Sequence, residues 1–369
     1  MIEILKLCWT NDNADLERAG RLLDEIKPAL ILVGEDGLGG PLHLIGVARD
    51  RRVPVVVVPY EYSTRVQIMR HINDYGRETH RLGNDLVSRA MVRLMPHWIA
   101  EGSDGPVTRL PPALAVSLRF HGMAPHQPWT VHGGMADRIA VESTAMLAHY
   151  RREGISERKL AFTGALANDE LHAVIRSDPA RALSFDNATK RVSGRTSILC
   201  ALPPSYLPER AKQSEFATFA ELATFWIDTL TSLPDVDVTF QLHPAVGLAD
   251  AEMIRRRAAV SEENIVELIP RSDILVTTVS SIIRYAIACR KPVVNYDVYR
   301  FENPDYVDAP GVLNIDTAKA FREGLSRLVS EDSYYSQLAS AQLQEGHHWG
   351  LLDGKAGGRF VALVDKLAR

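Results

Sequence analysis

Two series of short apolar runs, each alternating with amphipathic stretches, occupy the two halves of this 369-residue chain. Near-continuous apolar runs, such as those at 29–33 and 53–59, are typical of strands buried on both faces of a parallel sheet. The stretches between the runs carry apolar residues at helical spacing, which predicts the crossover helices that parallel strands require. The alternation therefore predicts an α/β protein with parallel sheets.

Because the pattern occurs twice, we expect two doubly wound, Rossmann-like domains that face a cleft, the architecture called GT-B. The expected strands include residues 2–9 and 265–268. Residues 60–115 are expected to leave the first sheet and return to it. The expected divisions are a first domain over 1–165, a linker over 166–195, a second domain over 196–350, and a C-terminal helix over 351–369 that is able to cross back to the first domain.

Composition narrows the class of function. The formal net charge is −4 and the pI is about 6.3, so the chain lacks the basic balance of most nucleic-acid-binding proteins. Three separated cysteines without a CxxC motif predict reduced core residues of a cytoplasmic protein. The longest strongly apolar run is far shorter than the roughly 20 residues of a spanning helix. We expect a cytoplasmic protein that binds no nucleic acid and has no transmembrane segment, with peripheral membrane contact left open.

A glycine-rich loop with two carboxylates follows the expected strand 29–33, in the sequence Gly34-Glu35-Asp36-Gly37-Leu38-Gly39-Gly40. In open α/β sheets, ligands bind at the carboxyl ends of the strands. A carboxylate at such an end is suited to act as a general base toward an acceptor hydroxyl, a role we assign to Asp36 and then to Glu35. Gly37 would let a substrate approach the backbone. The alternative is that Asp36 only caps the next helix.

Two further motifs follow expected strands of the second domain. His243 ends the strand at 236–242 and is held extended by Pro244, which places an imidazole where it can bind a phosphate oxygen. The turn at 277–281 precedes a helix and gathers hydroxyl and backbone N–H groups, as anion sites do. The predicted donor-phosphate ligands in this turn are Thr278, Ser280 and Ser281. The alternative for these serines is an ordinary helix N-cap.

Other residues near strand ends are expected to contact the substrates. They are Glu61, His132, Tyr296 and Asp297. No metal site is expected, since the adjacent His347 and His348 point apart on a helix and lack a carboxylate one turn away. No GxGxxG motif follows a strand, so we expect no dinucleotide and no other cofactor, a nucleotide-activated donor being a substrate.

The order of an Asp-Gly loop, a His-Pro pair and a Ser-Ser pair resembles bacterial GT-B transferases that use cytidine-nucleotide donors. These include sialyltransferases, polysialyltransferases, Kdo transferases and CDP-glycerol glycerophosphotransferases. Residues 272–297 (SDILVTTVSSIIRYAIACRKPVVNYD) resemble their Ser-Ser segment, and 353–359 (DGKAGGR) resemble their C-terminal segment. Residues 135–171 resemble the end of the N-terminal domain in this clan and, more distantly, in UDP-N-acetylglucosamine 2-epimerases.

This resemblance implies an inverting glycosyltransferase that moves a sugar from a CMP-linked or other nucleotide-linked donor to a glycan or glycolipid acceptor in surface polysaccharide biosynthesis. It makes the first domain the acceptor side and the second the donor side. Asp36 would deprotonate the acceptor, while His243 would bind the donor phosphate together with Ser280 and Ser281. Since these groups can carry the charge of the leaving phosphate, no obligatory Mg²⁺ is expected.

The chain also departs from these families. Thr277-Thr278-Val279 stands where the glycerophosphotransferases commonly show an acidic residue before Ser-Ser. The epimerases show Gly-Gly and paired glutamates where this chain has 280–284 (SSIIR). Three alternatives stay open: a UDP-sugar 2-epimerase or hydrolase on the same scaffold, a glycerol-phosphate type transferase, and a non-catalytic protein that binds a nucleotide-sugar.

Overall fold

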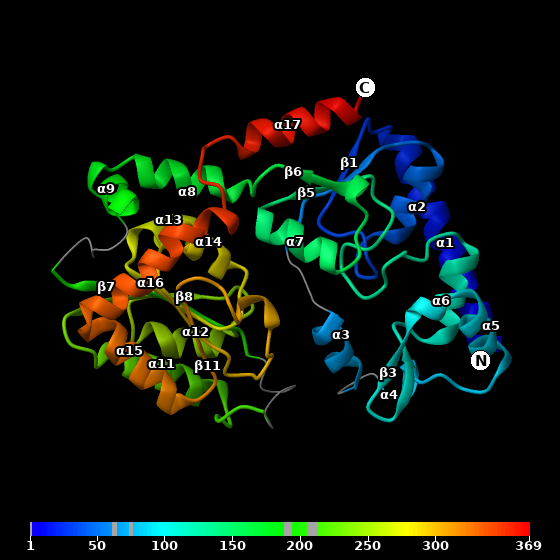
Figure 1. Cartoon of the computed structure of the whole chain (residues 1–369). Helices are drawn as coiled ribbons and strands as arrows, with labels where there is room; N and C mark the ends of the chain where they lie inside the picture. The colour runs from blue at the N-terminus through cyan, green and yellow to red at the C-terminus, as the bar shows by residue number, and fades with distance from the viewer. Residues whose placement is uncertain (1, 61–64, 74–76, 188–193, 206–212) are drawn as a thin grey trace. The chain divides into compact units, whose positions relative to one another are not determined.

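The chain forms two compact units, shown in a computed structural model that describes residues 2–60, 65–73, 77–187, 194–205 and 213–369 (Figure 1). The first unit comprises Met1–Thr163 together with Gly358–Arg369, and the second comprises Gly164–Gly357. Each unit is built on a parallel sheet with connecting helices. The expected α/β class, with two Rossmann-like domains, is confirmed.

A four-stranded parallel sheet in the order β1-β2-β5-β6 forms the centre of the first unit. Its strands are β1 (Ile31–Val33), β2 (Val55–Val57), β5 (Arg138–Val141) and β6 (Leu160–Phe162). The strands share one buried apolar core with α2 (Leu42–Asp50) and α7 (Thr144–Arg152). This packing brings the carboxyl ends of the strands to one edge of the sheet.

The chain between β2 and β5 leaves this sheet, as expected for residues 60–115. It forms an antiparallel hairpin, which the sequence did not predict, and several helices. These elements are α3 (Arg65–His71), α4 (Arg77–His80), α5 (Leu86–Leu94), β3 (Ile99–Gly102), β4 (Gly105–Thr108) and α6 (Pro112–Phe120). Buried side chains of α5 and α6 pack against each other in a separate small core.

Residues 2–9 are helical, so the prediction of a strand there was wrong. They begin α1 (Ile2–Ile26), a continuous helix that packs on α2 and α6. Asp12 is buried and accepts hydrogen bonds from His43 Nε2 of α2 (3.0 Å) and from the hydroxyl of Ser117 of α6. These tertiary contacts stabilise helix where local propensity is weak. Neither α1 nor any other helix in the described ranges has the length and apolarity needed to cross a membrane.

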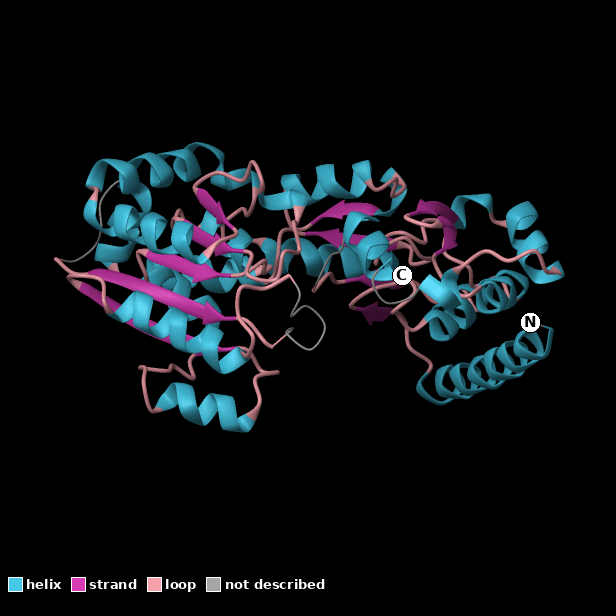
Figure 2. Cartoon of the chain, turned by 90° about the horizontal axis from the view of Figure 1, so that it is seen from below, coloured by secondary structure: helices cyan, strands magenta, loops and turns pink. Residues whose placement is uncertain are grey.

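A five-stranded parallel sheet in the order β11-β10-β9-β7-β8 forms the centre of the second unit. Its strands are β7 (Thr196–Leu202), β8 (Val236–Leu242), β9 (Ile274–Thr277), β10 (Val293–Tyr296) and β11 (Val312–Ile315). Figure 2 shows helices above and below these strands. They are α11 (Phe219–Thr231), α12 (Leu248–Arg255), α13 (Ile265–Arg271), α14 (Ile282–Ala288), α15 (Ala318–Ser330) and α16 (Asp332–Glu345).

The strand predicted at 265–268 is the start of α13 instead. The side chain of Asn264 accepts a hydrogen bond from Val266 N (3.1 Å) and caps this helix. A short, mostly apolar stretch such as 265–268 (IVEL) fits a short strand and a helix turn equally well, and the Asn264 cap favours the helix.

Residues 166–195, expected as a linker, contain α8 (Ala167–Arg176) and α9 (Pro179–Asn187) and belong to the second unit. The C-terminal helix α17 (Ala356–Leu367) begins in that unit, where Asp169 accepts hydrogen bonds from the N–H groups of Ala356 (2.9 Å) and Gly357 (2.8 Å). The remainder of α17 belongs to the first unit, and Arg359 Nε donates to Thr163 O (2.7 Å). The chain therefore passes between the units at residues 163–164 and again at 357–358.

Candidate functional site

The carboxyl edge of the second sheet gathers the predicted donor-phosphate residues. The register pairs Leu202 of β7 with Leu242 of β8 and Cys200 with Val276 of β9, so β8 and β9 end at nearly the same height on either side of β7. Two strand spacings separate them, or about 10 Å. His243 and the turn after β9 therefore lie at one edge, within the reach of a ligand with two phosphates.

His243 is exposed and has a defined tautomer. Its Nδ1 accepts a hydrogen bond from Ala245 N (3.1 Å), so in the neutral ring Nε2 carries the proton. Desolvation lowers the pKa of His243 below its ordinary value, so the ring is mostly neutral at pH 7. Nε2 is then an N–H donor at the sheet edge, and it has no hydrogen-bond partner within the described part of the chain.

The turn after β9 holds several unused donors. The Thr278 hydroxyl is buried and makes no hydrogen bond to any described residue. No acceptor in the described ranges takes a hydrogen bond from the backbone N–H groups of Ser280 or Ser281. An isolated buried hydroxyl is costly in free energy, so its presence is typical of a site completed by a ligand.

Ser281 occupies the N-cap position of α14, yet its side chain makes no capping hydrogen bond. The Ser280 hydroxyl accepts only a long contact of 3.5 Å from Ile282 N. The alternative of an ordinary serine cap is therefore weak at both positions. Behind the turn, Arg284 is buried and donates from Nε to Ser281 O at 3.4 Å, which puts a positive charge close to the turn.

Two side chains that were not predicted from the sequence hold this turn. Asn295 of β10 accepts a hydrogen bond from Val279 N (2.8 Å), and the Tyr306 hydroxyl donates to Ser280 O (3.0 Å). A polar residue inside the apolar strand 293–296 was the signal for Asn295, because a buried amide needs partners. Tyr306 gave no comparable signal.

Tyr296 and Asp297, predicted to contact substrate, have structural partners. The Tyr296 ring is fully buried and stacks with Trp226 and Phe321, while its hydroxyl donates to Glu215 (2.8 Å). Burial and the carboxylate of Glu215 raise the pKa of Tyr296 far above its ordinary value. The Asp297 carboxylate accepts hydrogen bonds from the backbone N–H groups of residues 301 (2.8 Å) and 302 (2.6 Å) and so closes its own loop.

Asp36 is fully buried in the first unit, so its carboxylate does not face an acceptor as predicted. One oxygen accepts hydrogen bonds from Lys159 Nζ (2.7 Å) and Ala136 N (2.8 Å), and the other accepts one from Gly134 N (3.2 Å). These partners stand just before β5 and β6, at the ends where those strands begin. The geometry is that of a buried ion pair that joins the loop after β1 to the starts of two other strands.

The glycines near Asp36 allow two loops to approach each other. A Cβ atom on Gly134 would lie 1.6 Å from Asp36 O, and one on Gly37 would lie 2.6 Å from Val131 O. Gly37 N also donates to Val131 O (2.8 Å). The close approach that its sequence predicted is therefore to backbone of the same unit, not to a substrate.

Glu35 and His132 are also buried, and Glu61 lies outside the described residues. The Glu35 carboxylate opposes the lowering of the Arg109 pKa that desolvation causes, so it acts as a countercharge to this half-buried arginine. The His132 ring meets the Tyr150 ring edge-on, with centroids 5.5 Å apart. The described residues among these, Glu35, Asp36 and His132, thus do not converge on one exposed site.

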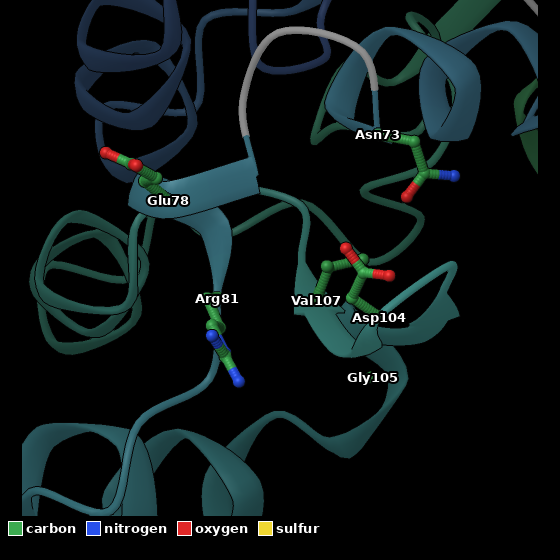
Figure 3. A pocket seen from close by; sticks show the side chains of 6 residues that line it. All are labelled: Asn73, Glu78, Arg81, Asp104, Gly105 and Val107. Carbon is green, nitrogen blue, oxygen red and sulfur yellow. The ribbon is translucent and has the colours of Figure 1, made fainter.

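A hollow of about 230 Å³ lies within the segment between β2 and β5 (Figure 3). It is lined by Asn73, Glu78, Arg81, Asp104, Gly105 and Val107. Glu78 and Arg81 come from one segment, but their side chains point in different directions in Figure 3. Among the described residues, no group of three His, Cys, Asp or Glu side chains is placed to hold a metal ion.

Comparisons with known proteins show similarity of fold. No protein-family model matches the sequence, and no curated protein matches it. The Staphylococcus aureus protein MnaA, solved with UDP, is 13% identical with a TM-score of 0.54, over 97% of this chain and 81% of MnaA. The Neisseria meningitidis UDP-GlcNAc 2-epimerase, solved with UDP-GlcNAc, is 14% identical with a TM-score of 0.53, over 96% of this chain and 81% of the epimerase. At such low identity these values support the GT-B-like fold alone.

The buried ion pair yields a prediction about stability. We expect Asp36→Ala to lower the free energy of unfolding of the first unit by about 3–5 kcal/mol, because the N–H groups of Gly134 and Ala136 would lose their acceptor and the partly buried Lys159 would lose its countercharge. The control is Asp24→Ala, which removes an exposed ion pair with Arg51 and should cost about 0–1 kcal/mol. Urea denaturation followed by hydrogen exchange of first-unit peptides would measure both. Equal losses in the two variants would contradict the structural role of Asp36.

Proposed function

We propose that the chain is an enzyme that binds a nucleotide-activated sugar, with the donor diphosphate at the carboxyl edge of the second sheet. The observation that carries this proposal is the unused donor set of the turn 278–281, above all the buried Thr278 hydroxyl without a hydrogen-bond partner among the described residues. The Nε2–H of His243 and the buried charge of Arg284 add to the same anionic preference.

In the proposed reaction, the bond between the sugar and the diphosphate breaks and negative charge grows on the leaving nucleotide. N–H and O–H donors fixed in place before the reaction stabilise that charge at little cost in reorganisation. His243 and the turn 278–281 are suited to this role without a metal ion, so we propose a metal-independent reaction. The sugar would pass to a glycan or glycolipid acceptor, which makes the enzyme a glycosyltransferase.

Neither of the two carboxylates predicted as the acceptor base is exposed. Asp36 is buried and engaged by Lys159, so it would have to leave an ion pair to meet a hydroxyl. Glu35 is the remaining predicted carboxylate, and it is also buried. A glycerol-phosphate type transferase would also require a base that deprotonates the acceptor hydroxyl.

A second candidate is a UDP-sugar 2-epimerase or hydrolase, which needs no separate acceptor. The observation in its favour is the fold similarity over 96–97% of the chain to structures described as bound to UDP or UDP-GlcNAc. The chain nevertheless has Ile282, Ile283 and Arg284 where the resemblance to epimerases would place acidic residues.

Incubation with UDP-GlcNAc alone separates the two reactions. For a transferase we expect no change in the sugar and only slow UDP release until an acceptor is added. Rapid appearance of a 2-epimer or of free UDP, monitored by NMR, would contradict the transferase and support the second candidate. The same incubation with excess EDTA should give the same rates, and a loss of rate would contradict the metal-independent reaction.

Binding measurements test the phosphate site directly. We expect His243→Ala and Ser281→Ala each to weaken the affinity for UDP or CDP roughly tenfold, because each removes one hydrogen bond to a charged group. His126→Ala, which changes an exposed histidine of the first unit, is the control. Isothermal titration calorimetry would give the affinities. Unchanged affinity in both site variants would refute the proposed location.

The lowered pKa of His243 predicts a pH dependence. A bound phosphate favours the imidazolium, so binding takes up a proton and the affinity should rise as the pH falls from 8 toward and below about 6.5. UDP-GlcNAc is the suitable probe because its diphosphate keeps its charge over this range. In His243→Gln the affinity should be nearly independent of pH. A wild-type profile as flat as that of the variant would contradict binding of the phosphate by the imidazolium form of His243.

A further inference from the structure

The turn 278–281 is held from both sides by a closed chain of hydrogen bonds. Asn295 Oδ1 accepts from Val279 N (2.8 Å), and Asn295 Nδ2 donates to Asn314 Oδ1 (2.8 Å). Asn314 Nδ2 donates to Tyr306 O (2.6 Å), and the Tyr306 hydroxyl donates to Ser280 O (3.0 Å). This series of hydrogen bonds begins and ends on adjacent residues of the turn. Its other members lie on β10, on β11 and in the connection between these two strands.

The carbonyl of Ser280 accepts hydrogen bonds from the Tyr306 hydroxyl (3.0 Å) and from Ile283 N at the start of α14 (3.2 Å), and its direction sets that of a second group. A trans peptide is planar, so the N–H of Ser281 points opposite to the C=O of Ser280. The Tyr306 ring is buried, with 1% of its surface exposed, and it stacks near Trp349 at a centroid distance of 6.0 Å. Because the Ser280 carbonyl points toward this buried hydroxyl, the Ser281 N–H points away from it.

Asn295 supplies the second constraint. It is also buried, and it takes the Val279 N–H toward the protein interior. Two peptide units of the turn are thereby fixed: the one between residues 278 and 279 through its N–H, and the one between residues 280 and 281 through its C=O. The turn cannot rotate the Ser281 N–H inward without breaking a buried hydrogen bond, and leaving such a group unpaired is costly.

We infer that Tyr306, supported by Asn314 and Asn295, is a positioning residue that aims the Ser281 N–H at the donor phosphate. This inference rests on the proposed function, since it concerns how the same turn binds its ligand. Tyr306 does not touch the phosphate. It keeps the donor oriented before the ligand arrives, so binding loses less free energy to reorganisation.

The test compares two buried tyrosines at opposite ends of β9. Tyr306→Phe removes the hydroxyl that holds Ser280 O after the strand. The control, Tyr335→Phe, removes a buried hydroxyl that donates to Asp273 O (3.4 Å) just before the strand. Both variants lose one hydrogen bond from a tyrosine to a backbone carbonyl, so their melting temperatures should fall by similar amounts.

Affinity for UDP distinguishes positioning from stability. We expect Tyr306→Phe to weaken UDP binding roughly tenfold, while Tyr335→Phe leaves it within about twofold of wild type. Asn314→Ala removes an exposed side chain from the same series of hydrogen bonds, and we expect it to weaken UDP binding by a smaller factor. The Asn314→Ala variant tests the same inference if Tyr306→Phe does not fold.

The ligand-induced shift of the Ser281 amide resonance gives a second readout. UDP should move this resonance strongly downfield in wild type and less in Tyr306→Phe. If wild type binds UDP and Ser281→Ala weakens binding, but Tyr306→Phe and Asn314→Ala both match Tyr335→Phe, the positioning role is overturned and the proposed function stands. If wild type binds neither UDP nor CDP, the proposed function fails, and the positioning role fails with it.

Discussion

The parallel pairing of β9 between β7 and β10 is the constraint on which the candidate site depends. It brings His243, the turn 278–281 and the loop after β10 to one edge, although they are separated by up to about 60 residues in the sequence. Because β9 is central in its sheet, its end cannot move without disturbing both neighbours. The turn therefore starts from a rigid support, and its donors can be fixed by side chains from β10 and beyond.

The first unit uses polar groups for a different purpose. Asp12 joins α1 to α2 and α6, and Asp36 joins a loop to the starts of β5 and β6. Both carboxylates are buried, and both are satisfied by several donors. In the second unit, by contrast, the turn after β9 contains donors without acceptors in the described residues. This difference between Asp36 and the turn 278–281 is the reason why the proposal places the ligand at the second sheet.

Much of the architecture could be predicted from the sequence because buried parallel strands are near-continuous apolar runs, as at 29–33 and 53–59. The positions of His243 and the Ser-Ser turn relative to strand ends followed from the same pattern. Asp36 shows that the pattern does not predict the direction in which a side chain points. A carboxylate after a strand can face solvent or turn inward, and its direction depends on Lys159, which lies 123 residues away in sequence. The helical state of residues 2–9 likewise depends on distant partners of Asp12. Asn295 and Tyr306 were missed because their roles arise from pairing between strands.

The central claim is that the turn 278–281 binds the diphosphate of a nucleotide. A crystal structure of the wild-type protein soaked with UDP tests it most directly. The account predicts phosphate oxygens within hydrogen-bond distance of Ser281 N and of the Thr278 or Ser280 hydroxyl, with His243 Nε2 contacting the same diphosphate. A well-ordered nucleotide bound elsewhere, with these donors still unpaired, would contradict the account.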